Sequence, residues 1–184
     1  MRSSVTADPA APRPRPGPRA LQGGALVLAL TSCTAADLPA GTAPLDPVAF
    51  FAGTSEGTAT LDPIIGRSVP VRVQSSGSRT EAGGLTLIQR ISEGSKPDRI
   101  RTWVMQPVGA GRYTGSLTDA EGPVAITVTG PRAVIRYVTP SGMTIRQQLA
   151  LQQDGRTIHN RLEAYKYGIR LAVLTENIRK PLAK

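Results

Sequence analysis

The chain has 184 residues, of which 40% are hydrophobic and 19% are charged, and it contains a single Cys. This length suits one domain and leaves no room for two, and the single Cys excludes an internal disulfide and a Cys-based metal site. The net charge of +9 is scattered, with four of the basic residues in the first 19 positions, so the composition does not indicate a nucleic-acid-binding protein.

The N-terminal segment has the organisation of an export signal. An Arg- and Pro-rich stretch over 1–19 precedes an uncharged, mostly apolar run over 20–30. That run is too short for a membrane-spanning helix, which needs about 20 apolar residues. We therefore expect a signal peptide over 1–32.

The sequence Leu30-Thr31-Ser32-Cys33 follows the apolar run and resembles the lipobox of bacterial lipoproteins. In that class the Cys thiol receives a diacylglyceryl group and the peptide is cut before it, so we expect lipid attachment at Cys33 and a membrane as partner. By the same resemblance Thr34, in place of Asp, indicates an outer-membrane lipoprotein facing the periplasm. The alternative is an ordinary secretory signal with an incidental Cys.

The segment over 33–47 is small, Pro-rich and without hydrophobic periodicity. Such a composition predicts a flexible, lipidated tether. The folded domain is therefore expected over 48–184.

From residue 48 on, short alternating segments are separated by turn residues. The clearest stretch is 111–151, where strands are predicted at 113–117, 124–129, 134–138 and 144–151. Similar alternation recurs at 69–74, 85–91, 100–105, 158–164 and 169–173, the last two joined by a hairpin turn at 165–168. This spacing predicts an all-β fold, a sandwich or a single antiparallel barrel of about 8–10 strands. We favour the barrel because sequential strands pair with their neighbours and closure removes exposed edges.

A set of short motifs is spread over 45–179. They are Phe50-Phe51-Ala52-Gly53, Glu56-Gly57, Gly66-Arg67, Gly111-Arg112-Tyr113-Thr114-Gly115, Asp119 with Glu121-Gly122, Arg136-Tyr137, Asn160-Arg161 and Lys166-Tyr167-Gly168-Ile169-Arg170. Together they resemble the domain-of-unknown-function 3833 family of bacterial lipoproteins. The resemblance implies a calycin-like barrel related to lipocalins and no catalytic residue, because that family has no established activity. The chain departs from the family pattern at Ile135, where the family tends to have Trp.

The sequence offers no catalytic or metal-ligating constellation. His159 is the only His and is predicted to be an outward-facing strand residue, so we expect no metal site and no cofactor. Asp119 and Glu121 lie in a predicted turn, which explains both residues without acid/base chemistry. Gly53, Gly57 and Gly66 lack the following helix and the Lys-Ser/Thr of a phosphate loop, and we expect them to allow a bulge or a sharp bend. An enzyme is therefore not expected.

Basic and aromatic residues in the predicted strands form the candidate ligand-binding set. Arg101 and Trp103 share one strand face, although the pattern does not show which face points inward, and Trp103 fits plain core packing as well as a pocket wall. Arg136 beside Tyr137, and Arg161, are candidates for a cation that meets a ligand carboxylate or a lipid headgroup. The alternative is that these arginines lie on the surface.

Two functions of different classes remain. One is a lipid-anchored barrel that binds a hydrophobic ligand such as a fatty acid or lipid fragment. The other is a non-catalytic structural or assembly lipoprotein that presents a surface to an envelope protein whose identity the sequence does not give. An apolar cavity of roughly a few hundred Å³ inside the barrel favours the first, and an interior filled by side chains favours the second.

Overall fold

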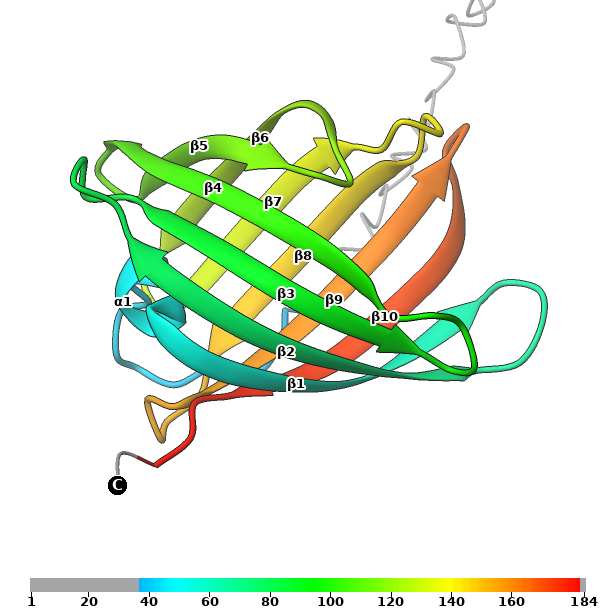
Figure 1. Ribbon diagram of the computed structural model, residues 1–184, viewed down its shortest axis with the longest axis horizontal. Coiled ribbons are helices and arrows are strands. Elements are labelled where there is room, and N and C mark those ends of the chain that lie inside the picture. Colours follow the sequence, from blue (N-terminus) through cyan, green and yellow to red (C-terminus); the bar gives the residue numbers. More distant parts are fainter. Residues whose placement is uncertain (1–36, 183–184) are drawn as a thin grey trace, which may run out of the picture. The chain divides into compact units, whose positions relative to one another are not determined.

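Ten strands follow one another along the chain, and the computed structural model describes residues 37–182. The strands are β1 (Gly53–Pro63), β2 (Val69–Arg79), β3 (Leu85–Glu93), β4 (Arg99–Gly109), β5 (Arg112–Leu117), β6 (Glu121–Thr129), β7 (Arg132–Val138), β8 (Thr144–Leu151), β9 (Thr157–Lys166) and β10 (Ile169–Arg179). Each strand pairs antiparallel with the next, and β1 also pairs with β10, so the sheet closes on itself (Figure 1). The all-β antiparallel barrel predicted from the sequence is confirmed.

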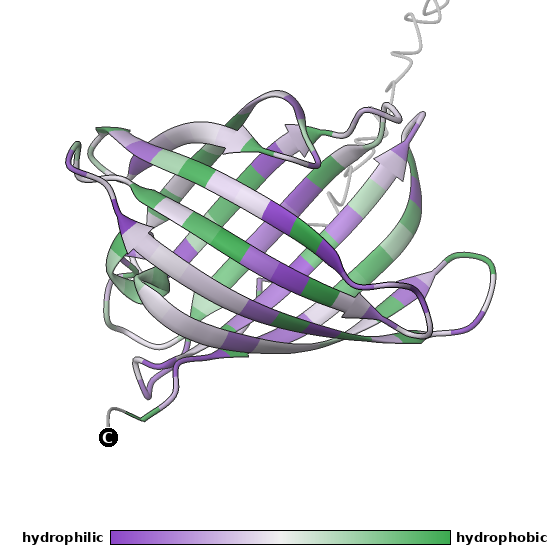
Figure 2. Cartoon of the chain, viewed as in Figure 1, coloured by the Kyte–Doolittle hydropathy of each residue, from purple (hydrophilic) through white to green (hydrophobic). Residues whose placement is uncertain are grey.

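Alternation along the strands decides which side chains face the interior, because successive Cβ atoms of an extended chain point to opposite faces. In β2 the buried positions Val71, Val73 and Ser75 alternate with exposed ones. Figure 2 shows this alternation as green and purple bands along the strands. In β4, where both faces carry apolar residues, Trp103 is buried inside and Ile100 is exposed.

The last strand departs from the predicted alternation. The sequence favoured Ile169, Leu171 and Val173 as its apolar face, but a bulge between Arg170 and Ala172 shifts the register against β9. Such a bulge inserts one unpaired residue and moves every later side chain to the opposite face. After the bulge the inner positions of β10 are Ala172, Leu174, Glu176 and Ile178, and Leu171 at the bulge also lines the interior.

A short helix closes one end of the barrel. In α1 (Pro47–Phe51), Asp46 caps the N-terminus by accepting a hydrogen bond from the backbone N–H of Ala49, and Pro47 fits the first turn. Phe50 and Phe51 are buried in the core at this end. Gly77 in β2 lets the helix approach, because a Cβ there would overlap the carbonyl oxygen of Phe51.

The expectation of a flexible tether over 33–47 is wrong for its second half. The backbone N–H of Gly41 donates to the carbonyl of Leu151 at 2.7 Å, and that of Leu45 donates to the carbonyl of Gly130 at 2.9 Å. Leu45 is also buried in the core. The apolar side chain of Leu45 and these two hydrogen bonds hold the segment against the closed end.

Residues 36–184 form one compact unit. Every strand finds both of its neighbours within this unit, so a fragment of residues 36–184 contains the whole barrel fold. The predicted signal peptide over 1–32 and the predicted lipid-attachment site, Cys33, lie outside the described residues. Between residues 37 and 182, no helix combines the length and apolar composition needed to cross a membrane.

The barrel interior contains two apolar clusters. The larger cluster lies at the α1 end and includes Phe51, Leu85 and Trp103. The smaller one consists of Ala59, Val71, Val73 and Ile91, packed by Leu61 and Leu174, and lies toward the opposite end. Buried polar side chains, among them Gln89, Gln147, Asn160 and Glu176, also occupy the interior. Burying a polar group without a hydrogen-bond partner destabilises the folded state, so the partners of these side chains are expected to lie close by.

Candidate functional site

The half of the barrel away from α1 encloses a cavity of about 530 Å³. Its apolar lining comes from Leu61, Val71, Val73, Ile91, Ile145, Leu162, Ala164, Ala172 and Leu174. Thr118, Asp119 and Thr139, in the loops after β5 and β7, also line it, so the cavity reaches the end opposite α1. Arg101, Gln147 and Glu176 line both this cavity and a small void of about 40 Å³ on the α1 side. These three side chains form the floor of the cavity.

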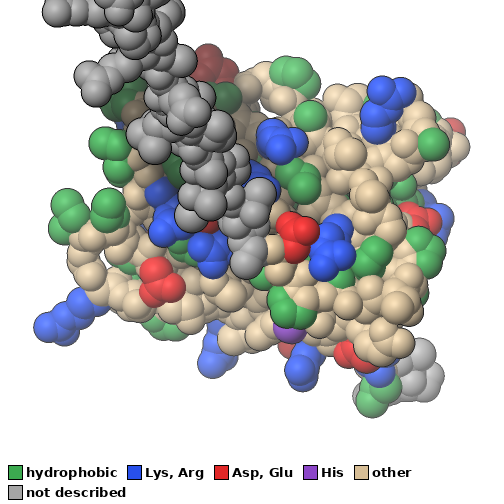
Figure 3. Space-filling view, turned by 180° about the vertical axis from the view of Figure 1, so that it is seen from behind, with side chains coloured by type: hydrophobic (Ala, Val, Ile, Leu, Met, Phe, Trp, Pro, Cys, Tyr) green, Lys and Arg blue, Asp and Glu red, His purple; other side chains and the backbone are tan. Residues whose placement is uncertain are grey.

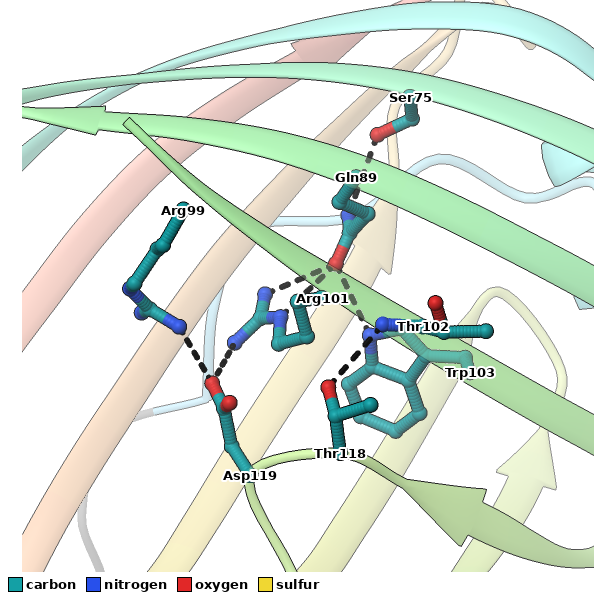
Figure 4. A network of polar contacts seen from close by, with 8 residues as sticks. All are labelled: Ser75, Gln89, Arg99, Arg101, Thr102, Trp103, Thr118 and Asp119. Carbon is teal, nitrogen blue, oxygen red and sulfur yellow. Dashed lines mark hydrogen bonds and ion pairs between the residues drawn. The ribbon is translucent and has the colours of Figure 1, made fainter. Parts of the chain in front are cut away.

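Gln89 in β3 holds the floor residue Arg101 and its neighbour Trp103, both in β4 (Figure 4). Its Oε1 accepts hydrogen bonds from Nε and Nη2 of Arg101 at 3.0 and 2.9 Å, and from Nε1 of Trp103 at 2.9 Å. Its Nε2 donates to Ser75 Oγ at 3.1 Å. The uncharged amide of Gln89 therefore orients the Arg101 guanidinium and accepts the hydrogen bond of the buried indole N–H of Trp103.

The Arg101 guanidinium retains donors that face the cavity. Only 14% of its side chain is exposed, and burial lowers the pKa of Arg101, which nonetheless stays protonated at neutral pH. Its Nη1 lies 3.9 Å from Asp119 Oδ2, too far for a hydrogen bond, while Arg99 Nη1 contacts the same oxygen at 2.5 Å. Within the described chain, Arg101 is thus a buried cation whose hydrogen-bonded partner, Gln89, is uncharged.

Glu176 and Asn160 form the opposite side of the site. Asn160 Nδ2 donates to Glu176 Oε2 at 2.7 Å. Burial raises the pKa of Glu176, against smaller opposing effects of the Asn160 hydrogen bond and the Arg101 charge. Gly57 makes room for this carboxyl, because a Cβ at Gly57 would overlap Glu176 Oε1. The expected bulge or bend at Gly57 is absent from the described strand β1, where Gly57 pairs regularly with Ile178 and Val73.

Two acceptors at the cavity lack a hydrogen-bond partner among the described residues. They are Gln147 Oε1 and Asn160 Oδ1, both buried, and their residues both line the cavity. A buried acceptor without a partner is costly unless water or a ligand supplies a donor. The floor therefore offers unfilled donors from Arg101 and unfilled acceptors from these two amides.

The structure brings together three of the five ligand-binding candidates. Arg101, Trp103 and Tyr137 point into the barrel, with the Arg101 guanidinium 5.6 Å from the Trp103 ring and the rings of Trp103 and Tyr137 packed edge to face at 6.1 Å. Arg136 lies on the outer face of β7 and is exposed, since it neighbours the inward-facing Tyr137. It cannot line the cavity, and the expectation for Arg136 is corrected accordingly.

Arg161 also lies on the outer face, where it belongs to a separate cluster. Its Nη2 contacts Glu163 Oε1 at 3.1 Å, and Arg170 Nη1 contacts the same oxygen at 3.2 Å. Arg146 Nη1 lies 3.7 Å from Glu163 Oε2, and the Tyr165 hydroxyl donates to that oxygen at 3.1 Å. Burial raises the pKa of Glu163, but the hydrogen bonds from Arg161 and Tyr165 outweigh it and the pKa is lowered. Glu163 therefore stays ionised among three arginines outside the barrel.

Sequence reasoning did not select Gln89, Asn160 or Glu176 as site residues. For Gln89 and Asn160 a signal existed, because each shares its predicted strand face with Leu or Ile, and a polar residue on an apolar face implies a buried hydrogen bond. Glu176 follows the bulge of β10, so its face was not predictable from the alternation before it.

The described residues offer no metal site. Residues 37–182 contain no group of three His, Cys, Asp or Glu side chains placed to hold an ion. His159 lies on the outer face of β9, as the sequence predicted, away from Arg101 and Glu176.

No protein-family model and no curated protein matches the chain. Among solved structures it is similar to an S-type phycobiliprotein lyase from Guillardia theta, with a TM-score of 0.59 and 6% identity over 74% of this chain and 92% of that one. It is also similar to a protein of unknown function from the DUF3598 family of Nostoc punctiforme, with a TM-score of 0.56 and 13% identity over 75% of this chain and 50% of that one. At these identities the likeness establishes the barrel fold alone. The resemblance to the domain-of-unknown-function 3833 family stays a prediction.

Proposed function

We propose that the barrel binds an amphipathic acid, such as a long-chain fatty acid, with its carboxylate at Arg101 and its chain along the apolar wall. The observation that carries this proposal is the buried Arg101, held by a neutral amide at the floor of a cavity of about 530 Å³. That volume lies in the range of roughly 300–1,000 Å³ that is typical of small-molecule sites.

The chemistry of the floor favours a carboxylate over an uncharged group. A guanidinium donates two parallel hydrogen bonds to a carboxylate, and Gln89 occupies the edge that contains Nε of Arg101. The remaining Nη donors are left for a ligand. A carboxylate would also balance the buried positive charge, since within the described residues Arg101 forms no ion pair with Glu176 and only a long contact with Asp119.

We place this binding module at the bacterial outer membrane, anchored by lipid on Cys33 and facing the periplasm. The support is the apolar run over 20–30, the lipobox-like sequence that ends at Cys33 and the resemblance to a lipoprotein family. The cavity favours binding over a purely structural role. One protein of similar fold is a lyase, but for this chain we propose binding without catalysis, because the floor groups are a cation, amides and one carboxyl.

The proposal is tested by ligand titration of the fragment 36–184, followed by the emission of Trp103, the only Trp in the chain. Trp103 contacts the floor network, so entry of a long-chain fatty acid is expected to change its emission saturably. The Arg101→Gln variant is expected to bind about tenfold or more weakly, because a charge-assisted hydrogen bond contributes about 1.5–3 kcal/mol.

Arg136→Ala is the matched control, since Arg136 is exposed on the outer face. It is expected to leave the affinity unchanged, and circular dichroism checks that all variants remain folded. The absence of saturable emission change with any acyl acid, or an equal affinity of the Arg101→Gln and Arg136→Ala variants, would contradict the proposal.

A further inference from the structure

Exposed apolar side chains gather at the end of the barrel where the cavity lies. Ile64 and Ile65 in the β1–β2 loop are 63% and 87% exposed, and Tyr167 and Ile169 at the β9–β10 turn are 92% and 58% exposed. We call these four residues the rim patch. The two segments adjoin, because the backbone N–H of Ile64 donates to the carbonyl of Leu171 at 2.7 Å.

The four residues of the rim patch lie in two adjoining segments at one end of the barrel. Other exposed large apolar residues of the described chain lie elsewhere, such as Ile88 and Ile100 on the walls of the neighbouring strands β3 and β4 and Val108 at the α1 end of β4. Isolated apolar residues on a surface are ordinary, but a group of them marks an interaction site. Tyr167 supports this reading, because it occupies a turn position with φ of 51°, where Gly or Asn fits more easily. The turn thus projects an aromatic ring into solvent at some conformational cost.

Basic side chains flank the rim patch. Arg67 follows Ile64 and Ile65 in their loop, and Lys166 and Arg170 flank the turn. The Lys166 ammonium lies 5.7 Å from the Tyr167 ring. We call Arg67, Lys166 and Arg170, together with Arg146 and Arg161, the basic flank.

The basic flank carries excess positive charge. Glu163 contacts Arg146, Arg161 and Arg170 at once, and one carboxylate cannot neutralise three guanidinium groups. Asp62 in β1 accepts a hydrogen bond from Ser68, and the acids Glu93 and Asp119 at the same end of the barrel are paired with Lys96 and Arg99. Figure 3 shows Lys and Arg side chains gathered on the back of the barrel and apolar side chains projecting at its left edge. Protruding apolar residues beside a positive surface are complementary to an anionic bilayer, whose phosphates lie above its acyl region.

We propose that this end of the barrel docks on an anionic phospholipid bilayer. The rim patch enters the interfacial region, where Tyr is a favoured residue, and the basic flank contacts the phosphates. The protruding shape of the two tips fits a deformable bilayer better than a protein partner, which would need a matching recess. Docking in this orientation brings the cavity to the lipid surface and does not depend on a ligand in the cavity. Because Leu38 and Gly41 are held at the α1 end, at most about 18 Å of extended chain joins Cys33 to that end, so the rim patch would meet a bilayer other than the one that holds Cys33.

The test is flotation of the fragment 36–184 with vesicles of phosphatidylcholine, with or without about one third phosphatidylglycerol. The fragment lacks Cys33 and the apolar run, so any binding comes from the barrel. We expect binding to the anionic vesicles only, with an affinity that falls as salt is raised. The Ile64→Ser/Ile65→Ser double variant is expected to bind about tenfold or more weakly.

The Ile88→Ser/Val108→Ser double variant is the matched control, because it removes two exposed aliphatic side chains away from the rim patch. It is expected to bind as the unmodified fragment does. Fatty-acid titration without vesicles is expected to be the same for both double variants, which separates docking from ligand binding. Three outcomes would overturn the proposal. The first is that the fragment does not bind anionic vesicles. The second is that the two double variants lose the same amount of vesicle binding. The third is that the rim patch mediates self-association in sedimentation experiments while the fragment binds no vesicles.

Discussion

Gln89 binds Arg101 without neutralising its charge. A single uncharged oxygen, Oε1 of Gln89, accepts hydrogen bonds from both Arg101 and Trp103. The Gln89→Glu variant keeps the size and the acceptors of the side chain but places a carboxylate against the guanidinium. We expect fatty-acid affinity to fall about tenfold or more, because the new ion pair competes with the ligand carboxylate. Trp103 emission titration measures the affinity. An affinity equal to that of the unmodified protein would show that Arg101 does not meet the ligand.

Glu176 makes the stability of the barrel depend on pH. Burial raises the pKa of Glu176 in the folded state. The contribution of Glu176 to the free energy of unfolding is therefore fully present below the pKa that this carboxyl has in the unfolded chain, and it is lost as the pH rises through the pKa in the folded state. Glu176→Gln keeps the acceptor for Asn160 and cannot ionise.

The Glu176→Gln variant is therefore expected to have a higher free energy of unfolding than the unmodified protein above the folded pKa of Glu176. The difference is expected to shrink as pH falls below the ordinary carboxyl range. Urea unfolding across a pH series measures both. If the difference in free energy of unfolding between the two proteins does not change with pH, the assignment of Glu176 as a buried, ionisable floor group is contradicted.

At the scale of elements, β5 to β8 were predictable to within a few residues because each has uninterrupted alternation and is bounded by Gly or Pro turns. The inner face of β4 was not predictable, since Ile100 and Trp103 lie on opposite faces and both are apolar. The inner face of β10 was predicted wrongly because a bulge at Leu171 depends on pairing with β9 and leaves no local signal. The cavity floor was predicted only in part, because its residues come from strands that are far apart in the sequence and no local pattern shows that they meet.

The fit of α1 against β2 is expected to be sensitive to a single methyl group. Gly77→Ala would place a Cβ against the carbonyl of Phe51, and neither backbone can move freely. We expect a loss of about 1–3 kcal/mol of unfolding free energy, as for other overpacked sites. Thermal and urea unfolding measure this loss. Ser76→Ala, at the exposed neighbouring position, is the control and is expected to change stability by no more than about 0.5 kcal/mol.

At the scale of the whole molecule, anchoring is expected to depend on Cys33. Cys33→Ser removes the only thiol and therefore the acceptor for diacylglyceryl transfer. We expect the variant to remain uncleaved or to be mislocalised, as measured by membrane fractionation after a high-salt wash and by the mass of the product. A variant of mature size that stays with the membranes after the high-salt wash would show that lipid on Cys33 is not the anchor.

The whole account depends on an acyl acid lying in the barrel with its carboxylate at the floor. The most direct measurement is a crystal structure of the fragment 36–184 with a long-chain fatty acid that carries bromine on its terminal carbon, because anomalous scattering locates the tail. We expect the carboxylate within hydrogen-bond distance of Arg101 and the bromine toward the loops after β5 and β7. Bromine at the floor beside Arg101, or a barrel without bromine at saturating ligand, would contradict the account.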